Sequence, residues 1–439
     1  MARVQTRTGG RAATAAIIPG RFALSVGMPD RPAPEGWLWT PLADVARLES
    51  GHTPSRKHPE YWGGSIPWIG IRDATGNHGR VLYDTAECTN ELGIANSSAR
   101  LLPANTVCLS RTASVGFVVV MGRPMATSQD FVNWVCSDRL NPHFLKYVLL
   151  SEWDALRTFA VGSVHPTIYF PEVKAFHVCL PRRCEQDRIA DVLGALDDKI
   201  DLNRRMNDKL EAMARAIFKD WFVDFGPTRA KMEGRAPYLA PDLWALFPDR
   251  LDEDGKPEGW PEGTLLDLCE LKRGYDLPTA QRRLGPIPIV SSSGVSGHHD
   301  TAMVDGPGVV TGRYGTIGEV FFLDEPFWPL NTALYVRDFN RNSPHFVFRV
   351  VSRLNFESYS DKGAVPGINR NDLHRAPVIL PSKEVQDAFD RLLVPFWTRS
   401  EVNRHESVSL AATRDLLLPK LMSGEVRIRA AEKVLEDVA

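Results

Sequence analysis

The feature that most constrains this chain is an internal duplication. Short segments recur in the same order, and over the second half of each copy they lie about two hundred residues apart. The pairs are "PEGW" at 34–37 and 257–260, "NPHF" at 141–144 with "SPHF" at 343–346, "VCLP" at 178–181 with "VILP" at 378–381, "EQDRIADVL" from 185 with "VQDAFDRLL" from 385, and "LNRR" at 202–205 with "VNRH" at 402–405. A chain of 439 residues is also too long for one ordinary core. We therefore expect two similar units.

Each copy has two parts with different periodicities. The first part contains short β-like runs, such as "TVCLS", "GFVVV", "GVVTG" and "GEVFFL", separated by Gly, Pro and Ser turns. The second part places its core positions in alternating steps of four and three residues, which is a heptad seam. The fold class predicted is α+β: two tandem mixed domains of short strands, separated by two long helices.

The two helical seams share one phase. In the first copy the seam consists of Ile189, Leu193, Leu196, Ile200, Asn203, Asn207, Leu210, Ala214, Ile217 and Trp221. In the second it consists of Phe389, Leu393, Phe396, Ser400, Asn403, Ser407, Leu410, Arg414, Leu417 and Leu421. Neither helix can bury such a stripe alone, so we expect an antiparallel coiled coil. The alternative is that each helix lies on its own domain.

These patterns predict the domain boundaries. The first segment is rich in arginine, has no acid before Asp30, and is expected to be disordered or to precede a true start at Met28. The predicted parts are an extension at 1–33, a first domain at 34–183, a first spacer helix at 184–225, a linker at 226–256, a second domain at 257–382, a second spacer helix at 383–424 and a tail at 425–439.

Composition excludes several classes of protein. A net charge of −2 and a pI near 6.6 argue against a nonspecific polycation, although a local basic face can act within a neutral chain. The six cysteines form no CxxC pair and no Cys/His ligand spacing, which favours reduced thiols in a cytoplasmic protein and no metal site. No apolar run is long enough to cross a bilayer.

The stretch "TGRYGTIGEV" at 311–320 has the glycines and the basic residue of a phosphate-binding loop. It lacks the Gly-Lys-Ser/Thr ending that such a loop requires. Its counterpart in the first copy is "SRTASVG" at 110–116, which keeps only the arginine, a hydroxyl residue and the last glycine. A phosphate-binding loop would not tolerate such different central residues, so we interpret both stretches as turns between strands.

Several longer motifs carry a family resemblance. In the first copy they are "SGHTPSR" at 50–56 and "IPWIGIRD" at 66–73. In the second copy they are "RGYDLPTAQR" at 273–282, "IPIVSSSGVSGHH" at 287–299, "GRYGTIGEVFF" at 312–322, "FWPLNTALYV" at 327–336 and "AVPGINRNDL" at 364–373. The ends of the two predicted helices match as well, with "AIFKDWFVDFGP" at 216–227 in the first copy and "LLLPKLMSGEV" at 416–426 in the second. With "PEGW", these resemble the specificity subunit of type I restriction–modification systems over nearly the whole chain after about Asp30.

The resemblance implies a function and a set of partners. Such a subunit is not an enzyme: its two target-recognition domains read a bipartite, asymmetric sequence in double-stranded DNA. It holds two methyltransferase subunits, which carry S-adenosylmethionine, and restriction subunits that use ATP join them. The chain itself is then expected to bind no cofactor. In agreement, it contains no Asn/Asp-Pro-Pro-Tyr/Phe motif for adenine methylation and no P-loop.

Other functions stay open at this point. A self-contained methyltransferase with fused target domains would bind its cofactor alone, and a coiled-coil scaffold would not bind DNA. A related defence system that uses the same module is a further alternative.

Candidate DNA-binding residues follow from the chemistry of base recognition. Arginine pairs with guanine, Asn or Gln with adenine, and Ser or Thr with either, whereas phosphate contacts fix position. In the first domain the candidates are Thr53, Ser55, Arg56, Lys57, Arg72, Arg111, Thr112, Ser114, Ser163, His165 and Thr167. In the second they are Tyr275, Gln281, Arg282, Arg283, Ser291, Ser292, Ser293, His298, His299, Arg313, Tyr314, Thr316, Lys362, Asn369 and Arg370. The alternative for any one arginine is a solvated surface charge.

Overall fold

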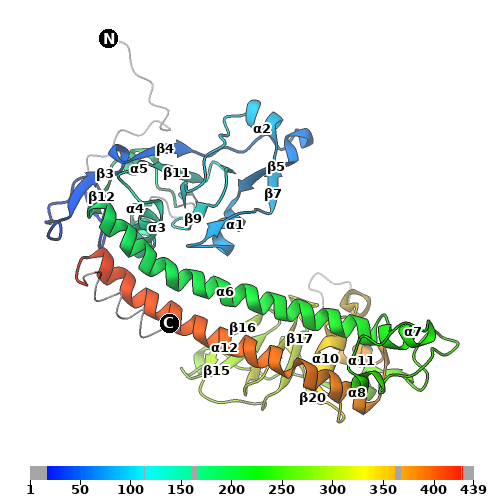
Figure 1. Cartoon of the computed structure of the whole chain (residues 1–439). Helices are drawn as coiled ribbons and strands as arrows, with labels where there is room; N and C mark the ends of the chain where they lie inside the picture. The colour runs from blue at the N-terminus through cyan, green and yellow to red at the C-terminus, as the bar shows by residue number, and fades with distance from the viewer. Residues whose placement is uncertain (1–16, 113, 161–165, 361–366, 427, 429–439) are drawn as a thin grey trace. The chain divides into compact units, whose positions relative to one another are not determined.

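The computed structural model describes residues 17–112, 114–160, 166–360, 367–426 and 428 (Figure 1). It divides into two compact units. Unit 1 comprises Met1–Arg204 and Arg404–Ala439, and unit 2 comprises Arg205–Asn403. Both long helices therefore contribute one half to each unit.

The centre of unit 1 is a five-stranded sheet. Its strand order is β4 (Ala46–Ser50), β11 (Phe131–Cys136), β8 (Val107–Ser110), β9 (Val118–Met121) and β6 (Val81–Leu82). All four residues of β8 and all four of β9 are buried, so both strands are covered on both faces. Val118 and Val120 face the main core, whereas Val119 and Met121 face a smaller one, as the period of two requires.

Two further sheets complete unit 1. One contains β10 (Ala126–Thr127), β5 (Trp62–Ile69) and β7 (Glu87–Thr89); the other contains β1 (Ile18–Pro19), β2 (Leu24–Val26), β12 (Phe176–Leu180) and β3 (Leu38–Pro41). The short helices are α1 (Ile71–Gly76), α2 (Glu91–Ala95), α3 (Pro142–Ser151), α4 (Trp153–Phe159) and α5 (Phe170–Lys174). Asn141 caps α3 by accepting the His143 and Phe144 backbone N–H groups.

Unit 2 repeats this arrangement. Its sheets are β14 (Glu270–Arg273), β20 (Ala333–Asp338), β17 (Gly308–Gly312) and β18 (Val320–Leu323); β16 (Gly294–His299), β15 (Ile287–Ser291) and β19 (Trp328–Pro329); and β13 (Glu262–Thr264) with β21 (Pro377–Ile379). The short helices are α7 (Gly226–Met232), α8 (Pro241–Trp244), α9 (Leu265–Leu268), α10 (Pro344–Val351) and α11 (Arg370–Leu373). The order of the shared strands is the same in both units, which confirms the predicted duplication and the α+β class.

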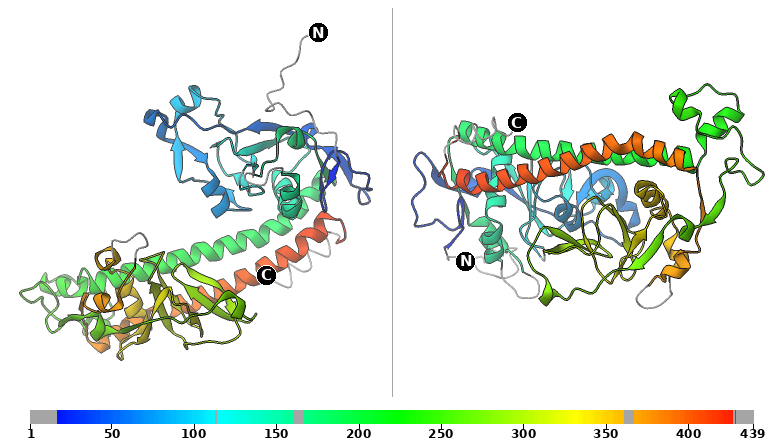
Figure 2. Two further views of the ribbon diagram at one scale, coloured as in Figure 1. Left: turned by 180° about the vertical axis from the view of Figure 1, so that it is seen from behind. Right: turned by 90° about the horizontal axis from the view of Figure 1, so that it is seen from below.

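The two long helices, α6 (Arg183–Phe222) and α12 (Lys383–Met422), have 40 residues each, or about 60 Å of helix. In unit 1 Asp197 of α6 pairs with Arg414, and Asn203 donates to Glu406 at 2.7 Å. In unit 2 Asn207 donates to the Ser400 backbone oxygen at 3.2 Å. Residues later in α6 contact residues earlier in α12, so the two helices are antiparallel and the predicted antiparallel coiled coil is confirmed (Figure 2).

The seam positions also pack on the domains. Leu410, Leu417 and Leu421 of α12 belong to the core of unit 1. Ala214 and Trp221 of α6 belong to the core of unit 2. The two helices therefore pack on each other and also on the domains, so both of the predicted alternatives occur in each unit.

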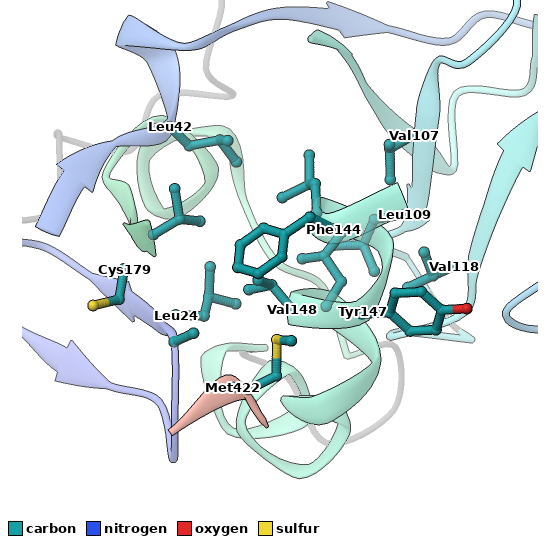
Figure 3. Close-up of a cluster of buried hydrophobic side chains, with 14 of the residues drawn as sticks. Leu24, Leu42, Val107, Leu109, Val118, Phe144, Tyr147, Val148, Cys179 and Met422 are labelled. Carbon is teal, nitrogen blue, oxygen red and sulfur yellow. The ribbon is translucent and has the colours of Figure 1, made fainter. Parts of the chain in front are cut away.

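The prediction that residues 1–33 form a disordered extension is wrong for residues 17–33. Strand β2 pairs with β12, and Ala23, Leu24 and Val26 are fully buried. Figure 3 shows Leu24 in one cluster with Phe144 of α3 and Met422 of α12. Residues 1–16 lie outside the described part of the chain.

A buried carboxylate holds this N-terminal hairpin in place. Glu152 accepts hydrogen bonds from four consecutive backbone N–H groups, those of Arg21, Phe22, Ala23 and Leu24, at 2.6, 2.5, 2.8 and 3.2 Å. Burial raises the pKa of Glu152, and the four donors oppose that effect because they favour the charged form.

The predicted linker at 226–256 packs on unit 2. It contains α7 and α8, and Phe247 is buried against Trp221 with ring centroids 5.0 Å apart. The aromatic side chains bury enough area to fix this segment on unit 2. Of the predicted tail, residues 427 and 429–439 lie outside the described residues. Within the described residues, no helix has the length and apolar character needed to span a bilayer.

Candidate nucleic-acid interface

The two arginine-bearing turns occupy equivalent places. Arg111 and Gly116 lie between β8 and β9, and Arg313 and Gly318 lie between β17 and β18. The last glycine of each turn has a positive φ, 102° at Gly116 and 93° at Gly318, which explains why it survives in both copies. The prediction of turns between strands is confirmed.

The backbones of Arg111 and Arg313 are held in the same way. The N–H of Arg111 donates to the Asp130 oxygen at 2.7 Å, and that of Arg313 donates to the Thr332 oxygen at 2.8 Å. On the other side, the Arg111 oxygen accepts from Ile168 N–H, and the Arg313 oxygen accepts from Ile368 N–H, at 2.9 Å in both cases. Each arginine is thus fixed between the central sheet and the segment that leads into α5 or α11.

Both guanidinium groups lie over aromatic rings. That of Arg111 is 4.7 Å from the Phe170 ring centroid and donates through Nη2 to the Gln129 backbone oxygen at 3.2 Å. That of Arg313 is 4.5 Å from the Tyr314 ring centroid. Burial lowers the pKa of Arg111, which still leaves it charged at neutral pH. Neither group forms an ion pair with a carboxylate in the described part of the chain, although the charge of Asp130 opposes the lowering of the Arg111 pKa.

Arg56 lies in a different environment. Its two terminal nitrogens bond both oxygens of Glu87, with Nη2 to Oε2 at 2.7 Å, and its guanidinium carbon lies 3.8 Å from the Trp62 ring centroid. The hydrogen bond to Glu87 is the main reason why the pKa of Arg56 is raised. A bidentate carboxylate and a stacked ring hold this side chain in one orientation.

In unit 2 a comparable pair lies beside the β15–β16 hairpin. Arg283 Nε is 2.8 Å from Asp300 Oδ2, and the Arg283 backbone N–H donates to His299 Nδ1 at 3.0 Å. Hydrogen bonds from Thr301 and the charge of Arg283 lower the pKa of Asp300, although partial desolvation opposes them.

The family model for the type I restriction modification DNA specificity domain matches residues 34–212 and 257–407. These two matches cover well over half of the chain and coincide with its two copies. The chain belongs to this family.

Its relatives agree over most of their length. The chain is 26% identical over 426 residues to the type I restriction enzyme MjaIX specificity subunit of Methanocaldococcus jannaschii, covering 90% of this chain and 94% of that one. It is 25% identical over 387 residues to the HindI specificity subunit of Haemophilus influenzae, covering 70% and 84%. The crystal structure of a type I restriction-modification system S subunit from M. genitalium has the same fold, with a TM-score of 0.53 at 14% identity, covering 88% and 96%.

Many of the predicted site residues lie on the surface of the specificity domains. Exposed residues are Ser55, Arg56, Lys57, Arg72, Gln281, Arg283, Ser293, His298, Tyr314, Thr316, Asn369 and Arg370. Half-buried residues are Thr53, Arg111, Thr112, Ser114, Tyr275, Arg282, Ser291 and Arg313. The predicted Ser163, His165 and Lys362 lie outside the described residues.

Three predicted readers are buried instead: Thr167, Ser292 and His299, with exposed fractions of 8%, 9% and 3%. Thr167 forms a β-bridge with Thr112, and the His299 ring lies edge-on to Trp328 at 5.2 Å. In the described structure all three side chains pack within the domains.

Sequence reasoning missed two carboxamides near the arginines. Gln129 precedes β11 and accepts a hydrogen bond from the Thr53 hydroxyl; Asn331 precedes β20 and donates to Asp276. Neither residue belongs to a basic or Gly-rich stretch. The signal for this pair is its position, because each lies two residues before the equivalent strand, β11 or β20.

Proposed function

We propose that this chain is the non-catalytic specificity subunit of a type I restriction–modification complex and that it reads a bipartite DNA sequence with two unlike half-sites. One observation carries the proposal. Two DNA specificity domains occur in one chain. Each has an arginine, Arg111 or Arg313, at the same turn, with the same backbone hydrogen bonds and no ion pair to a carboxylate among the described residues.

The chemistry of the two domains supports unlike half-sites. A phosphodiester backbone is the same in every sequence, so the shared arginines suit it. Bases differ, and the residues around each arginine differ as well: Thr112 and Ser114 in the first turn correspond to Tyr314 and Thr316 in the second. Two domains with different polar surfaces read two different base sequences.

The same proposal assigns catalysis to partners. Two methyltransferase subunits would carry S-adenosylmethionine and modify adenine in each half-site, and restriction subunits would use ATP. The chain directs these subunits to the target and binds neither cofactor. The supporting observation is the sequence itself, which contains no adenine-methylation motif and no P-loop.

The test is to sequence modified adenines across the source genome with and without this gene. We expect one bipartite methylated motif to disappear when the gene is removed and to return on complementation. Unchanged methylation would overturn the proposal.

Binding measurements separate the alternatives. The purified chain with its methyltransferase partners should prefer a duplex with the motif over a scrambled one, with a steep dependence on salt. A scaffold would bind neither duplex. A self-contained methyltransferase would bind S-adenosylmethionine as the isolated chain, which the proposed subunit does not.

A further inference from the structure

Gln129 and Asn331 occupy the same place in the two specificity domains. Each follows a two-residue strand, β10 or β19, that pairs in parallel with β5 or β15. Each lies two residues before β11 or β20. The surrounding sequences, "TSQDF" and "PLNTA", have no residue in common at matching positions. The carboxamide is the side-chain group that both domains keep.

A glycine brings a second segment next to each carboxamide. A Cβ atom on Gly51 would lie 1.9 Å from the Ser128 oxygen, and one on Gly274 would lie 2.2 Å from the Leu330 oxygen, so only glycine permits this approach. Just beyond, His52 N–H donates to the Thr127 oxygen at 2.9 Å, and Tyr275 N–H donates to the Pro329 oxygen at 2.8 Å. The residues that follow these two are Thr53 and Asp276, which therefore lie beside the carboxamides.

The two neighbours orient the carboxamides in opposite senses. The Thr53 hydroxyl donates to Gln129 Oε1, which leaves the Gln129 N–H groups available. An ionised carboxylate can only accept, so Asp276 requires the Asn331 amide nitrogen as its donor, which leaves Asn331 Oδ1 available. Arg273 Nη2 lies 3.7 Å from Asp276 Oδ1.

We propose that Gln129 and Asn331 each read one base, and that Thr53 and Asp276 are positioning residues that decide which edge of the carboxamide faces the DNA. The inference rests on the proposed function and names residues within that site. An outward N–H recognises an acceptor, such as guanine O6 or thymine O4. An outward oxygen recognises a donor, such as adenine N6 or cytosine N4. The first domain thus presents donors, and the second presents an acceptor, at the same position of the fold.

The experiment compares variants in the complex with the methyltransferase partners, using the methylated motif as the readout. Gln129→Ala should make one position of one half-site degenerate, and Asn331→Ala should do the same in the other half-site. Thr53→Asp provides a carboxylate that only accepts, so the Gln129 nitrogen should turn towards residue 53. The preferred base should then change at the same position that Gln129→Ala makes degenerate. Asp276→Asn offers a donor as well as an acceptor, so the Asn331 nitrogen is no longer obliged to face inward, and the change should act at the Asn331 position.

Binding to duplexes that carry single base changes provides the second readout. Each alanine variant should lose roughly ten- to hundred-fold discrimination at its own position, with an unchanged salt slope because no phosphate contact is removed. Thermal unfolding of each variant should match the parent. Arg123→Gln and Arg235→Gln, which alter exposed ion pairs elsewhere on each unit, are the matched controls.

The outcomes are distinguishable. If both alanine variants leave every position of the motif intact, the carboxamides do not read bases. If Thr53→Asp acts at a position different from that of Gln129→Ala, the positioning role is wrong. If the parent complex itself shows no bipartite motif, the proposed function fails, whatever the variants do.

Discussion

The sheet built on β12 in unit 1 has four strands, whereas its counterpart built on β21 in unit 2 has two. The extra strands, β1 and β2, come from the start of the chain, and Glu152 fixes the loop between them through four backbone N–H groups. Unit 2 has α7, α8 and a cluster of aromatic rings instead. The turns, the central sheet and the helix contacts are common to both units. The two specificity domains therefore share one framework, but different segments cover its edge: β1 and β2 in unit 1, and α7 and α8 in unit 2.

The largest expected effect comes from removing what unit 1 alone possesses. Starting the chain at Met28 should destabilise unit 1 by roughly 5 kcal/mol or more. Buried side chains such as Leu24 and Val26 contribute about 1.5–3 kcal/mol each, and Glu152 would lose its donors. Composition alone suggested that this deletion would be harmless; the buried hairpin reverses that expectation. Thermal and denaturant unfolding measure the effect.

Two substitutions provide the controls for this deletion. Glu152→Gln keeps the hairpin but replaces the acceptor, and should cost roughly 1.5–3 kcal/mol. Glu91→Gln on the exposed face of α2 should stay within about 0.5 kcal/mol of the parent. A truncated chain that unfolds at the parent temperature would mean that β1 and β2 are dispensable.

The next effect concerns the buried ion clusters that anchor the long helices. In unit 1, Asp197 of α6 bonds Lys146 at 3.0 Å, Tyr147 at 2.7 Å and Arg414 at 2.8 Å. Burial alone would raise the pKa of Asp197, but Lys146, Arg414 and Tyr147 outweigh it and lower that pKa. In unit 2, Arg349 of α10 makes a bidentate pair with Glu211, whose carboxylate is more exposed.

We therefore expect Asp197→Asn to cost about 3–5 kcal/mol, because it leaves two cations without their shared partner, and Glu211→Gln to cost less. The Asp197 contribution is present at neutral pH and is lost as the pH falls below 3.8, through the lowered pKa. Denaturant titrations of both variants at neutral pH give the comparison. Equal costs would show that burial does not distinguish the two clusters.

A smaller effect concerns two histidines at equivalent positions in the two units. Burial, helped by the charge of Arg349, lowers the pKa of His345 to about 4, and its ring stacks on Trp397 with centroids 3.4 Å apart. A histidine that is neutral when folded binds fewer protons than when unfolded. Unit 2 should therefore lose stability as the pH falls from 6.5 towards 4, by on the order of 1–3 kcal/mol.

Replacing His345 by Phe should remove that part of the pH dependence. The measurement is the free energy of unfolding, followed by tryptophan fluorescence, at several values of pH. The equivalent residue in unit 1 is His143, whose pKa is also lowered by burial and by Lys146, and His143→Phe is the matched variant. If the slope between these pH values stays the same in His345→Phe, another group titrates there.

These comparisons also show what the sequence could and could not reveal. The duplication and the seam through Leu193 and Leu393 were visible because they depend on residue type at fixed spacing. The hairpin was missed because β1 and β2 have only two and three residues, too short for a period to appear. Its anchor, Glu152, is more than a hundred residues away in sequence. Gln129 and Asp276 were missed for a similar reason, since their roles depend on the close approach of two separate segments.

The last prediction tests the feature that the units share. Arg111 and Arg313 have the same backbone contacts, yet the residues around them differ, so we expect them to contact phosphates rather than bases. Arg111→Gln and Arg313→Gln should each weaken binding of the complex to cognate and scrambled duplexes by the same factor. Each should reduce the slope of log affinity against log salt by about 0.9 while leaving the methylated motif unchanged. Lysine at either position should retain most of the slope, because the charge remains. Loss of base preference in one half-site, with the salt slope unchanged, would instead make that arginine a reader, and the two domains would then differ even at the position where they look most alike.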